Sequence, residues 1–277
     1  MAFDINNFVL DETKRVFSRN PDTGAMNFLV GQIEDAQITC DSEEITKNDA
    51  KGTPISKWSQ AKTANFSASN SLLDFSLMSW QFNGENKTVA SSGSALIAPA
   101  IEEHTLAGSD SLTEYTLANS VVAESDSTYK ITVALLTRDG ACKKNFTQIT
   151  VGDLATGQFK YTSGTHKLTF FSGDLALGDK LFIAYEYSTE NAVAVYNSAD
   201  KYATAQEMWV EVLGHDICSA GTIYHGYVVF PNASLSASTT VALTRDSSFP
   251  FEFSANQDYC SDNHELFRIV IPQPAES

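Results

Sequence analysis

The sequence has few of the features that mark disulfide-bonded, membrane-spanning or secreted proteins. Its four cysteines lie far apart and form no CxxC pair: Cys40, Cys142, Cys218 and Cys260. No apolar run approaches the roughly 20 residues that a membrane-spanning helix needs, and the first residues show no apolar segment behind basic ones, as a signal peptide would. We therefore expect synthesis in the cytosol, free thiols and no membrane partner.

Positive charge is also scarce. The 277 residues include 18 Lys and Arg against 34 Asp and Glu, so the formal net charge is −16 at pH 7. A chain of this sign repels nucleic-acid phosphates and anionic membranes, which excludes tight non-specific binding to either. An acidic surface can equally serve solubility alone.

Catalytic motifs are missing as well. The sequence contains no GxSxG elbow, no glycine-rich phosphate loop, no HExxH and no clustered pair of carboxylates. Two pairs, His215-x-x-Cys218 and Cys260-x3-His264, supply the ligand types of a zinc site. Residues three apart on a strand point to opposite faces, however, and neither spacing matches a common zinc motif. We expect no enzyme activity, no catalytic residues, no metal and no cofactor.

What the sequence does contain is apolar alternation with a period of two. In the last quarter this alternation covers residues 223–230, 241–244, 249–253 and 267–271, and Pro231-Asn232 and Pro272 end two of the runs. Four such strands in a short stretch indicate a closed or layered antiparallel sheet. Because 43% of the residues are hydrophobic, the chain has ample material for a core. The predicted fold class is mainly β, an antiparallel barrel or sandwich.

The N-terminal region is more polar. Residues 1–25 carry turn signals at 20–24, and we expect an arm with little structure of its own. Residues 26–30 and 32–39 indicate strands, with a bulge near Asp35 where the alternation breaks. Residues 40–58 are charged, and we expect a long loop that is either functional or simply a mobile surface feature. The loop residues of interest are Ser42, Glu43, Glu44, Lys47, Asp49, Lys51 and Lys57.

A strand is predicted over residues 59–69, and one helix follows it. In this helix apolar residues recur every three or four positions, which predicts a buried stripe that packs on the barrel. The stripe consists of Leu72, Phe75, Met78 and Phe82, and it is widened by Leu73, Leu77 and Trp80. Ser71 with Asp74 is similar to a capping box, and Asn83-Gly84 is a C-terminal stop.

The order of the C-terminal strands resembles that of bacteriophage tail tube proteins. The matching segments are YVVFPNASLSAS (227–238), TVALTRD (240–246), FPFEFSANQD (249–258) and ELFRIVIP (265–272). The match is one of pattern and order over most of the chain and not one of diagnostic residues. The resemblance implies a β-barrel flanked by one α-helix.

Residues 106–190 have a strand pattern of their own, with alternation over 131–136 and 181–187 and a hairpin signal at Asp139-Gly140. The segment 157–189 resembles the small β-sandwich that is inserted in some tail tube proteins of long contractile tails. We therefore expect a discontinuous barrel domain, residues 1–105 and 191–277. An immunoglobulin-like β-domain, residues 106–190, would interrupt it. A single larger β-domain is the alternative.

The resemblance implies a structural subunit that polymerises as stacked, hexameric rings around an acidic channel. Double-stranded viral DNA would pass through this channel during ejection without specific binding. The implied partners are further copies of the chain, a tail sheath, and baseplate or terminator proteins. The implied location is the tail of a virion that is assembled in a bacterial host. The loop 40–58 would contact the next ring, and the inserted domain would decorate the outside.

Two alternatives remain open. The aromatic strands and the Ser-, Thr- and Asn-rich loops also suggest a soluble or surface-displayed carbohydrate-binding β-sandwich. Another virion structural protein, such as a baseplate or capsid decoration protein, would have a similar composition.

Overall fold

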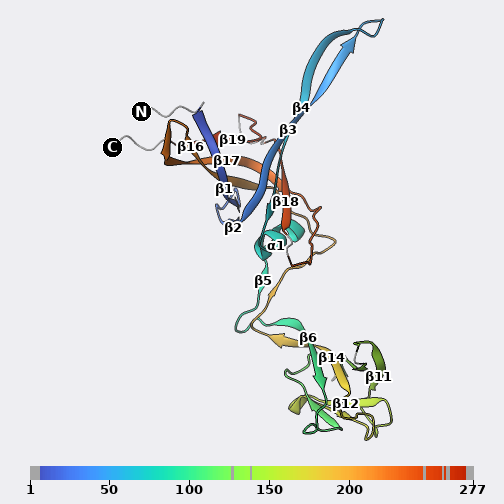
Figure 1. Cartoon of the computed structure of the whole chain (residues 1–277). Coiled ribbons are helices and arrows are strands. Elements are labelled where there is room, and N and C mark those ends of the chain that lie inside the picture. Colours follow the sequence, from blue (N-terminus) through green and yellow to red (C-terminus); the bar gives the residue numbers. More distant parts are fainter. Residues whose placement is uncertain are drawn as a thin grey trace. The chain divides into compact units, whose positions relative to one another are not determined.

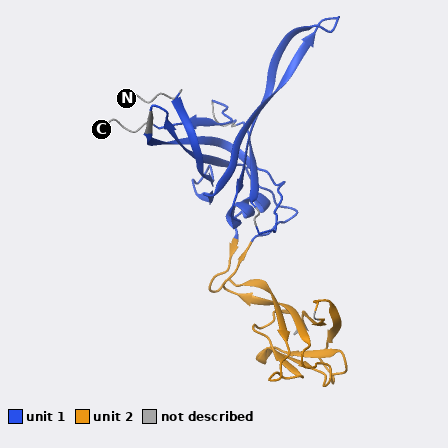
Figure 2. Cartoon of the chain, viewed as in Figure 1, with its two compact units in different colours: residues 1–87, 195–277 blue, residues 88–194 orange. Residues whose placement is uncertain are grey.

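The structure is a computed structural model that describes residues 7–125, 128–137, 139–245, 248–257, 259 and 263–272. These residues form a mainly β fold of largely antiparallel sheets with one α-helix, which confirms the predicted class. The chain folds as two compact units, unit 1 from residues 1–87 and 195–277 and unit 2 from residues 88–194 (Figure 2).

These boundaries differ from the predicted ones at 105/106 and 190/191. The cause is β6 (Leu96–Thr105), which pairs along its whole length with β14 (Lys180–Thr189) of unit 2. Alternation in a sequence shows that a segment is a strand, but it does not show which sheet the strand joins. The connection therefore belongs to unit 2 from Thr88 onward.

Unit 1 is a curved, open sheet with the strand order β2-β1-β16-β17-β18-β4-β3, and β19 pairs with β17 beside this path (Figure 1). Helix α1 packs near β2 at the lower end of the sheet as drawn. The elements are β1 (Phe8–Arg19), β2 (Met26–Val30), β3 (Ile33–Asn48), β4 (Pro54–Asn70), α1 (Phe75–Asn83), β16 (Gln206–Asp216), β17 (Ser219–Leu235), β18 (Phe249–Ala255) and β19 (Arg268–Val270).

Aromatic residues from neighbouring strands fill the core of unit 1. Phe249, Phe251 and Phe253 share one face of β18 and are buried, while the residues between them are exposed. Phe66 of β4 stacks on Phe253 with ring centroids 4.8 Å apart, and Phe230 of β17 meets the same ring edge-on at 4.9 Å. The alternation read from this part of the sequence thus marks the inward face of the sheet.

The N-terminal segment corrects an expectation. Instead of a weakly structured arm, residues 8–19 form β1, which pairs with β16 along its length and with β2 from Val16 to Arg19. Val16 and Ser18 are buried on the inner face. The outer face carries charged residues such as Arg19, which forms a two-point ion pair with Glu207 at 2.7 and 2.9 Å. Because the outer face of β1 carries ion-paired charges, its sequence lacks the apolar alternation that would have indicated a strand.

The predicted bulge near Asp35 is confirmed. Asp35 has a φ of 52°, and the pairing of β3 with β4 shifts its register between Glu34 and Gln37. The pairing then continues to Asn48 of β3 and Pro54 of β4, with further register shifts between Asp41 and Glu43 and between Lys47 and Asn48.

Helix α1 begins later than the apolar stripe predicts. Asp74 is the N-cap, and its side chain accepts hydrogen bonds from the backbone N–H groups of Ser76 and Leu77, each at 2.8 Å. Gly84 ends the helix in the left-handed region at φ 67°, as the Asn83-Gly84 stop predicts. The N-cap is therefore Asp74 and not Ser71.

This start position changes which stripe residues are buried. Met78 is buried and Phe82 packs against the core, but Leu72 is 62% exposed and Phe75 is 45% exposed. Leu72 precedes the helix, and Phe75 is its first residue. Leu77 takes their place and is fully buried.

Two further expectations about the C-terminal strands are wrong. Strand β17 continues through Pro231-Asn232 to Leu235, because Pro231, which has no N–H, falls where the pairing with β16 shifts its register. Residues 241–244 lie in no strand, and Leu243 is 89% exposed. A short segment with apolar alternation does not form a strand when no neighbouring strand pairs with it.

Unit 2 contains a seven-stranded sheet with the order β6-β14-β10-β11-β12-β13-β7, in which β11 and β12 pair in parallel. Buried residues such as Phe159, Leu168, Leu181 and Ile183 form its own core. Besides β6 and β14, its elements are β5 (Thr88–Val89), β7 (Glu114–Thr116), β8 (Ala123–Ser125), β9 (Thr128–Tyr129), β10 (Ile131–Leu136), β11 (Cys142–Gln148), β12 (Gln158–Thr162), the 3-10 turn η2 (Ser163–Thr165), β13 (Lys167–Phe170) and β15 (Val193–Ala194).

Candidate assembly site

The charged segment 40–58 is part of a long β-hairpin, so the expectation of an irregular loop is wrong. Strands β3 and β4 stay paired from Ile33 with Asn70 to Asn48 with Pro54, and the hairpin projects beyond the rest of the sheet (Figure 1). We call residues 42–60 the distal hairpin. Most of its side chains are exposed on both faces, so its sequence needs no apolar alternation.

The predicted contact residues all lie on the distal hairpin, and the structure brings some of them together. Lys57 Nζ lies 3.5 Å from Glu44 Oε2, and Gln60 Nε2 donates a hydrogen bond to Glu43 Oε2 at 3.1 Å. Both contacts join β3 to β4 across the hairpin. Glu44 and Lys57 are about 60% exposed, so their ion pair adds little to stability.

The tip of the hairpin is held by one side chain. Asp49 Oδ1 accepts hydrogen bonds from the backbone N–H groups of Lys51 and Thr53, each at 2.8 Å. Gly52 adopts a left-handed φ of 87°, which closes the turn. These contacts give the tip a defined conformation and leave Lys47 and Lys51 exposed. Ser42, the seventh predicted residue, is half-buried at the base of the distal hairpin.

Sequence analysis missed two apolar residues on the same hairpin. Ile55 is 64% exposed and Trp58 is 46% exposed, and Trp58 lies opposite Ile45 on the partner strand. Trp is enriched where proteins bind one another, because it contributes a large area of apolar contact. Bulky apolar side chains inside a mostly polar segment are the signal that would have identified them.

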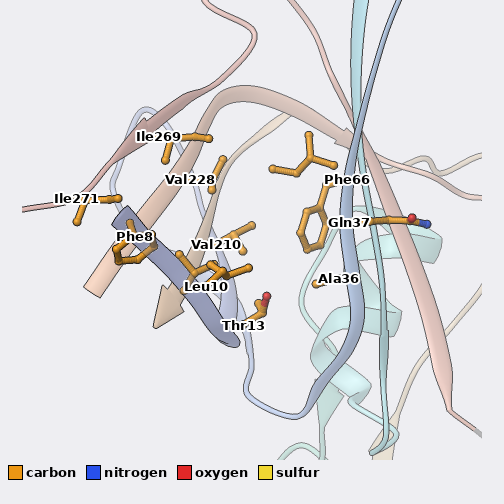
Figure 3. A pocket seen from close by; sticks show the side chains of 12 residues that line it. Phe8, Leu10, Thr13, Ala36, Gln37, Phe66, Val210, Val228, Ile269 and Ile271 are labelled. Atoms are coloured by element: carbon orange, nitrogen blue, oxygen red, sulfur yellow. The ribbon is translucent and has the colours of Figure 1, made fainter. Parts of the chain in front are cut away.

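An apolar groove opens into the same unit between β1 and β3 (Figure 3). Its volume is about 350 Å³. Its lining includes Phe8, Leu10, Ile38, Phe66, Ile269 and Ile271. Phe66 belongs to the core, whereas Leu10 and Ile269 are 58% and 60% exposed. The groove is thus the place where the curved sheet is open and the core of unit 1 reaches the solvent.

The two sides of this opening are strand edges. Strand β3 is the last strand in the sheet order, and from Val9 to Arg15 strand β1 is paired with β16 but not with β2. A row of unpaired backbone N–H and C=O groups can pair with a strand from another chain.

The outer face of β1, β16 and β17 carries a buried carboxylate. Glu211 is 1% exposed and accepts hydrogen bonds from Arg15 Nε and from His225 Nδ1, the latter at 2.7 Å, while Lys14 Nζ lies 3.6 Å away. Burial raises the pKa of Glu211. The hydrogen bonds from Arg15 and His225 and the attraction of Arg15 and Lys14 outweigh burial, so the pKa lies below its ordinary value. The carboxylate is fully engaged in joining the strands.

The residue pairs considered for zinc do not form a site in the part of the chain that the structure describes. His215 Nδ1 lies 2.9 Å from Asp11 Oδ2, and Cys218 is an exposed free thiol, as are Cys40 and Cys142. Cys260 lies outside the described residues. Among those described, no group of three or more His, Cys, Asp or Glu side chains is placed to hold a metal ion.

Comparisons with known proteins add no assignment. Neither the models of known protein families nor the curated proteins contain a match to this chain. Within the described ranges, no helix has both the length and the apolar character that crossing a bilayer requires.

Proposed function

We propose that this chain is a structural subunit of a bacteriophage tail tube, which polymerises as stacked, hexameric rings. The observation that carries the proposal is a single open sheet that combines unpaired strand edges with a projecting hairpin. Unpaired edges favour continuation of the sheet into neighbouring chains. Contacts between different surfaces of identical copies generate rings when the rotation closes and filaments when it does not.

The net charge of −16 supports the proposed passage of DNA. A channel with an acidic lining leaves the phosphates unbound, whereas a basic lining would hold them by strong, salt-sensitive contacts. Double-stranded DNA would therefore slide through without specific binding. The further proposed partners are a sheath and the baseplate or terminator proteins that close the tube in the virion.

Unit 2 has its own sheet and its own core, which suits a domain inserted into the tube subunit. We propose that it decorates the outside of the tube.

The carbohydrate-binding alternative has less support. Phe249, Phe251 and Phe253 of the aromatic strand are buried, so their rings do not form a platform on which a sugar can stack.

Electron microscopy of the purified protein tests the proposal. At high protein concentration we expect rings and tubes with a central channel, and light scattering should rise with concentration. A chain that stays monomeric at high concentration in both measurements contradicts the tube function.

A further inference from the structure

We infer that a hollow beside Glu211 in unit 1 binds a small organic carboxylate. Its volume is about 470 Å³, which lies within the roughly 300–1,000 Å³ of typical small-molecule sites. Strands β1, β16 and β17 supply most of its lining, which includes Arg15, Glu211, Ile223, His225, Tyr227 and Pro272. The inference goes beyond the tube function and does not depend on it.

The hollow offers hydrogen-bond donors, because the one carboxylate among its lining residues is covered. Glu211 is 1% exposed and accepts hydrogen bonds from Arg15 Nε and His225 Nδ1. These contacts hold the guanidinium and the imidazole in place. The described part of the chain supplies no hydrogen-bond partner for the terminal nitrogens of Arg15 or for the hydroxyl of Tyr227. The side chain of Arg15 is 45% exposed, so a ligand in the hollow can reach it.

A carboxylate matches these donors. The planar guanidinium of Arg15 can place two parallel N–H groups on the two oxygens of a carboxylate. The Tyr227 hydroxyl can donate one more hydrogen bond to the same group. His225 adds a donor at Nε2 when its ring is protonated, because the hydrogen on Nδ1 is already bound to Glu211.

Other parts of the lining are apolar and suit the organic body of such a ligand. Ile223 is 63% exposed and Pro272 is also exposed, so a ring that covers them removes apolar surface from water. The two acids of β1 do not line the hollow. One of them, Asp11, lies 2.9 Å from Nδ1 of His215.

Isothermal titration calorimetry with benzoate as the probe, at constant ionic strength, tests the site. Benzoate should bind about tenfold or more tightly than acetate, which lacks the ring, and than benzyl alcohol, which lacks the charge. Arg15→Gln removes the guanidinium and should weaken benzoate binding about tenfold or more. Tyr227→Phe keeps the ring and removes the hydroxyl, and it should weaken binding about threefold or more.

His225 predicts that binding depends on pH. The charged and titratable groups around its ring are Glu211 of β16, Lys14 and Arg15 of β1, and Tyr224 and Tyr227 of β17. Benzoate binding should strengthen as the pH falls from about 8 to about 6, the range in which histidine gains its proton while carboxylates stay ionised. His225→Gln keeps an amide donor for Glu211 and should remove most of this dependence.

Arg19→Gln is the matched control. Arg19 donates to Glu207 from Nε and Nη2, at 2.7 and 2.9 Å, and does not line the hollow. This variant should bind benzoate as the unchanged chain does. Circular dichroism before each titration shows whether a variant is folded. If Arg15→Gln does not fold, Tyr227→Phe and His225→Gln carry the test, because both leave the pair of Arg15 and Glu211 in place.

Three results would overturn the inference. The first is an unchanged chain that releases or absorbs no heat with benzoate, or that binds acetate equally well. The second is benzoate binding that the substitutions at Arg15, Tyr227 and His225 leave unchanged. The third is an equal loss in Arg19→Gln, which would show a response to net charge and not a site.

Discussion

At the scale of single residues, one buried carboxylate connects three strands of unit 1. Glu211 is buried on the outer face of the sheet and joins β1, β16 and β17 through Arg15 and His225. Its pKa lies below the ordinary value of 4.5. The ionised carboxylate therefore stabilises the fold above about pH 4.5, and this contribution is lost as the pH falls through the lower, folded-state pKa.

Glu211→Gln tests this role. The variant keeps the shape of the side chain but loses its charge, so we expect a loss of about 1–2 kcal/mol in the free energy of unfolding at pH 7. The difference from the unchanged chain should shrink as the pH falls from 4.5 through the lower, folded-state pKa, where the native carboxylate gains a proton. Urea unfolding at pH 7 and at a pH below the folded-state pKa measures both quantities.

Glu252→Gln is the matched control, because Glu252 is exposed on β18. It should change the free energy of unfolding by less than about 0.5 kcal/mol at either pH. An equal effect of the two substitutions would contradict a special role for Glu211.

At the scale of elements, capping residues determine where the helix begins and ends. Asp74 and Gly84 define the ends of α1, and the start at Phe75 turns Leu77 inward. The apolar stripe by itself gives Phe75 and Leu77 similar weight, but the structure separates them into an exposed and a buried residue.

Leu77→Ala and Phe75→Ala form a matched pair on this helix. We expect Leu77→Ala to lower the free energy of unfolding by about 3–4 kcal/mol, because it opens a cavity under a fully buried side chain. Phe75→Ala, at a 45% exposed position, should cost about 1 kcal/mol or less. Chemical denaturation monitored by circular dichroism measures both. A larger effect at Phe75 would show that the helix packs through the opposite face.

The hairpin is the second element with a testable role. Glu43 and Gln60 are cross-strand partners, so residues 44–59 can be replaced by an Asn-Gly turn without changing the register below them. We expect the shortened chain to unfold at an unchanged temperature and to lose stacking, with single rings preserved. High salt should weaken stacking of the unchanged chain, because it screens the charges of the tip.

Electron microscopy and light scattering measure these effects. Full-length tubes from the shortened chain would show that the hairpin is only a surface feature and that stacking uses other contacts.

At the scale of the whole molecule, the division into two units follows the hydrophobic cores and not the order of the sequence, since unit 1 consists of two separate stretches of the chain. Unit 1 and unit 2 each have their own buried cluster, and unit 2 begins and ends at the short pair of β5 and β15. Thr88 lies opposite Ala194 in this pair, so the two ends of the insertion are neighbours, with Cα atoms about 5 Å apart.

Removal of unit 2 tests this division. Deletion of residues 88–194, with a short Gly-Ser bridge between Lys87 and Val195, should leave a soluble chain that folds and still assembles. Residues 88–194 alone should also fold, since they carry their own core. Circular dichroism and thermal unfolding of both pieces provide the measurement, and two unfolded pieces would show that the cut passes through one domain.

Short-range chemistry in the sequence predicted a good part of this fold. Alternation identified β18 and, in unit 2, β10 and β14; Asn83-Gly84 marked the end of the helix, and the broken pattern near Asp35 marked a bulge. These features depend on neighbours along the chain, so sequence spacing is sufficient to find them. The hexameric tube, its partners and the contact role of the distal hairpin remain predictions.

Only the tertiary structure decided the rest. Charged strands such as β1 and the distal hairpin are held by cross-strand pairing, which no local pattern encodes. The apolar groove draws its lining from strands at both ends of unit 1, from Phe8 to Ile271. Whether such a residue is buried or left at an opening depends on where the sheet ends, and that is determined by pairing between segments far apart in the sequence.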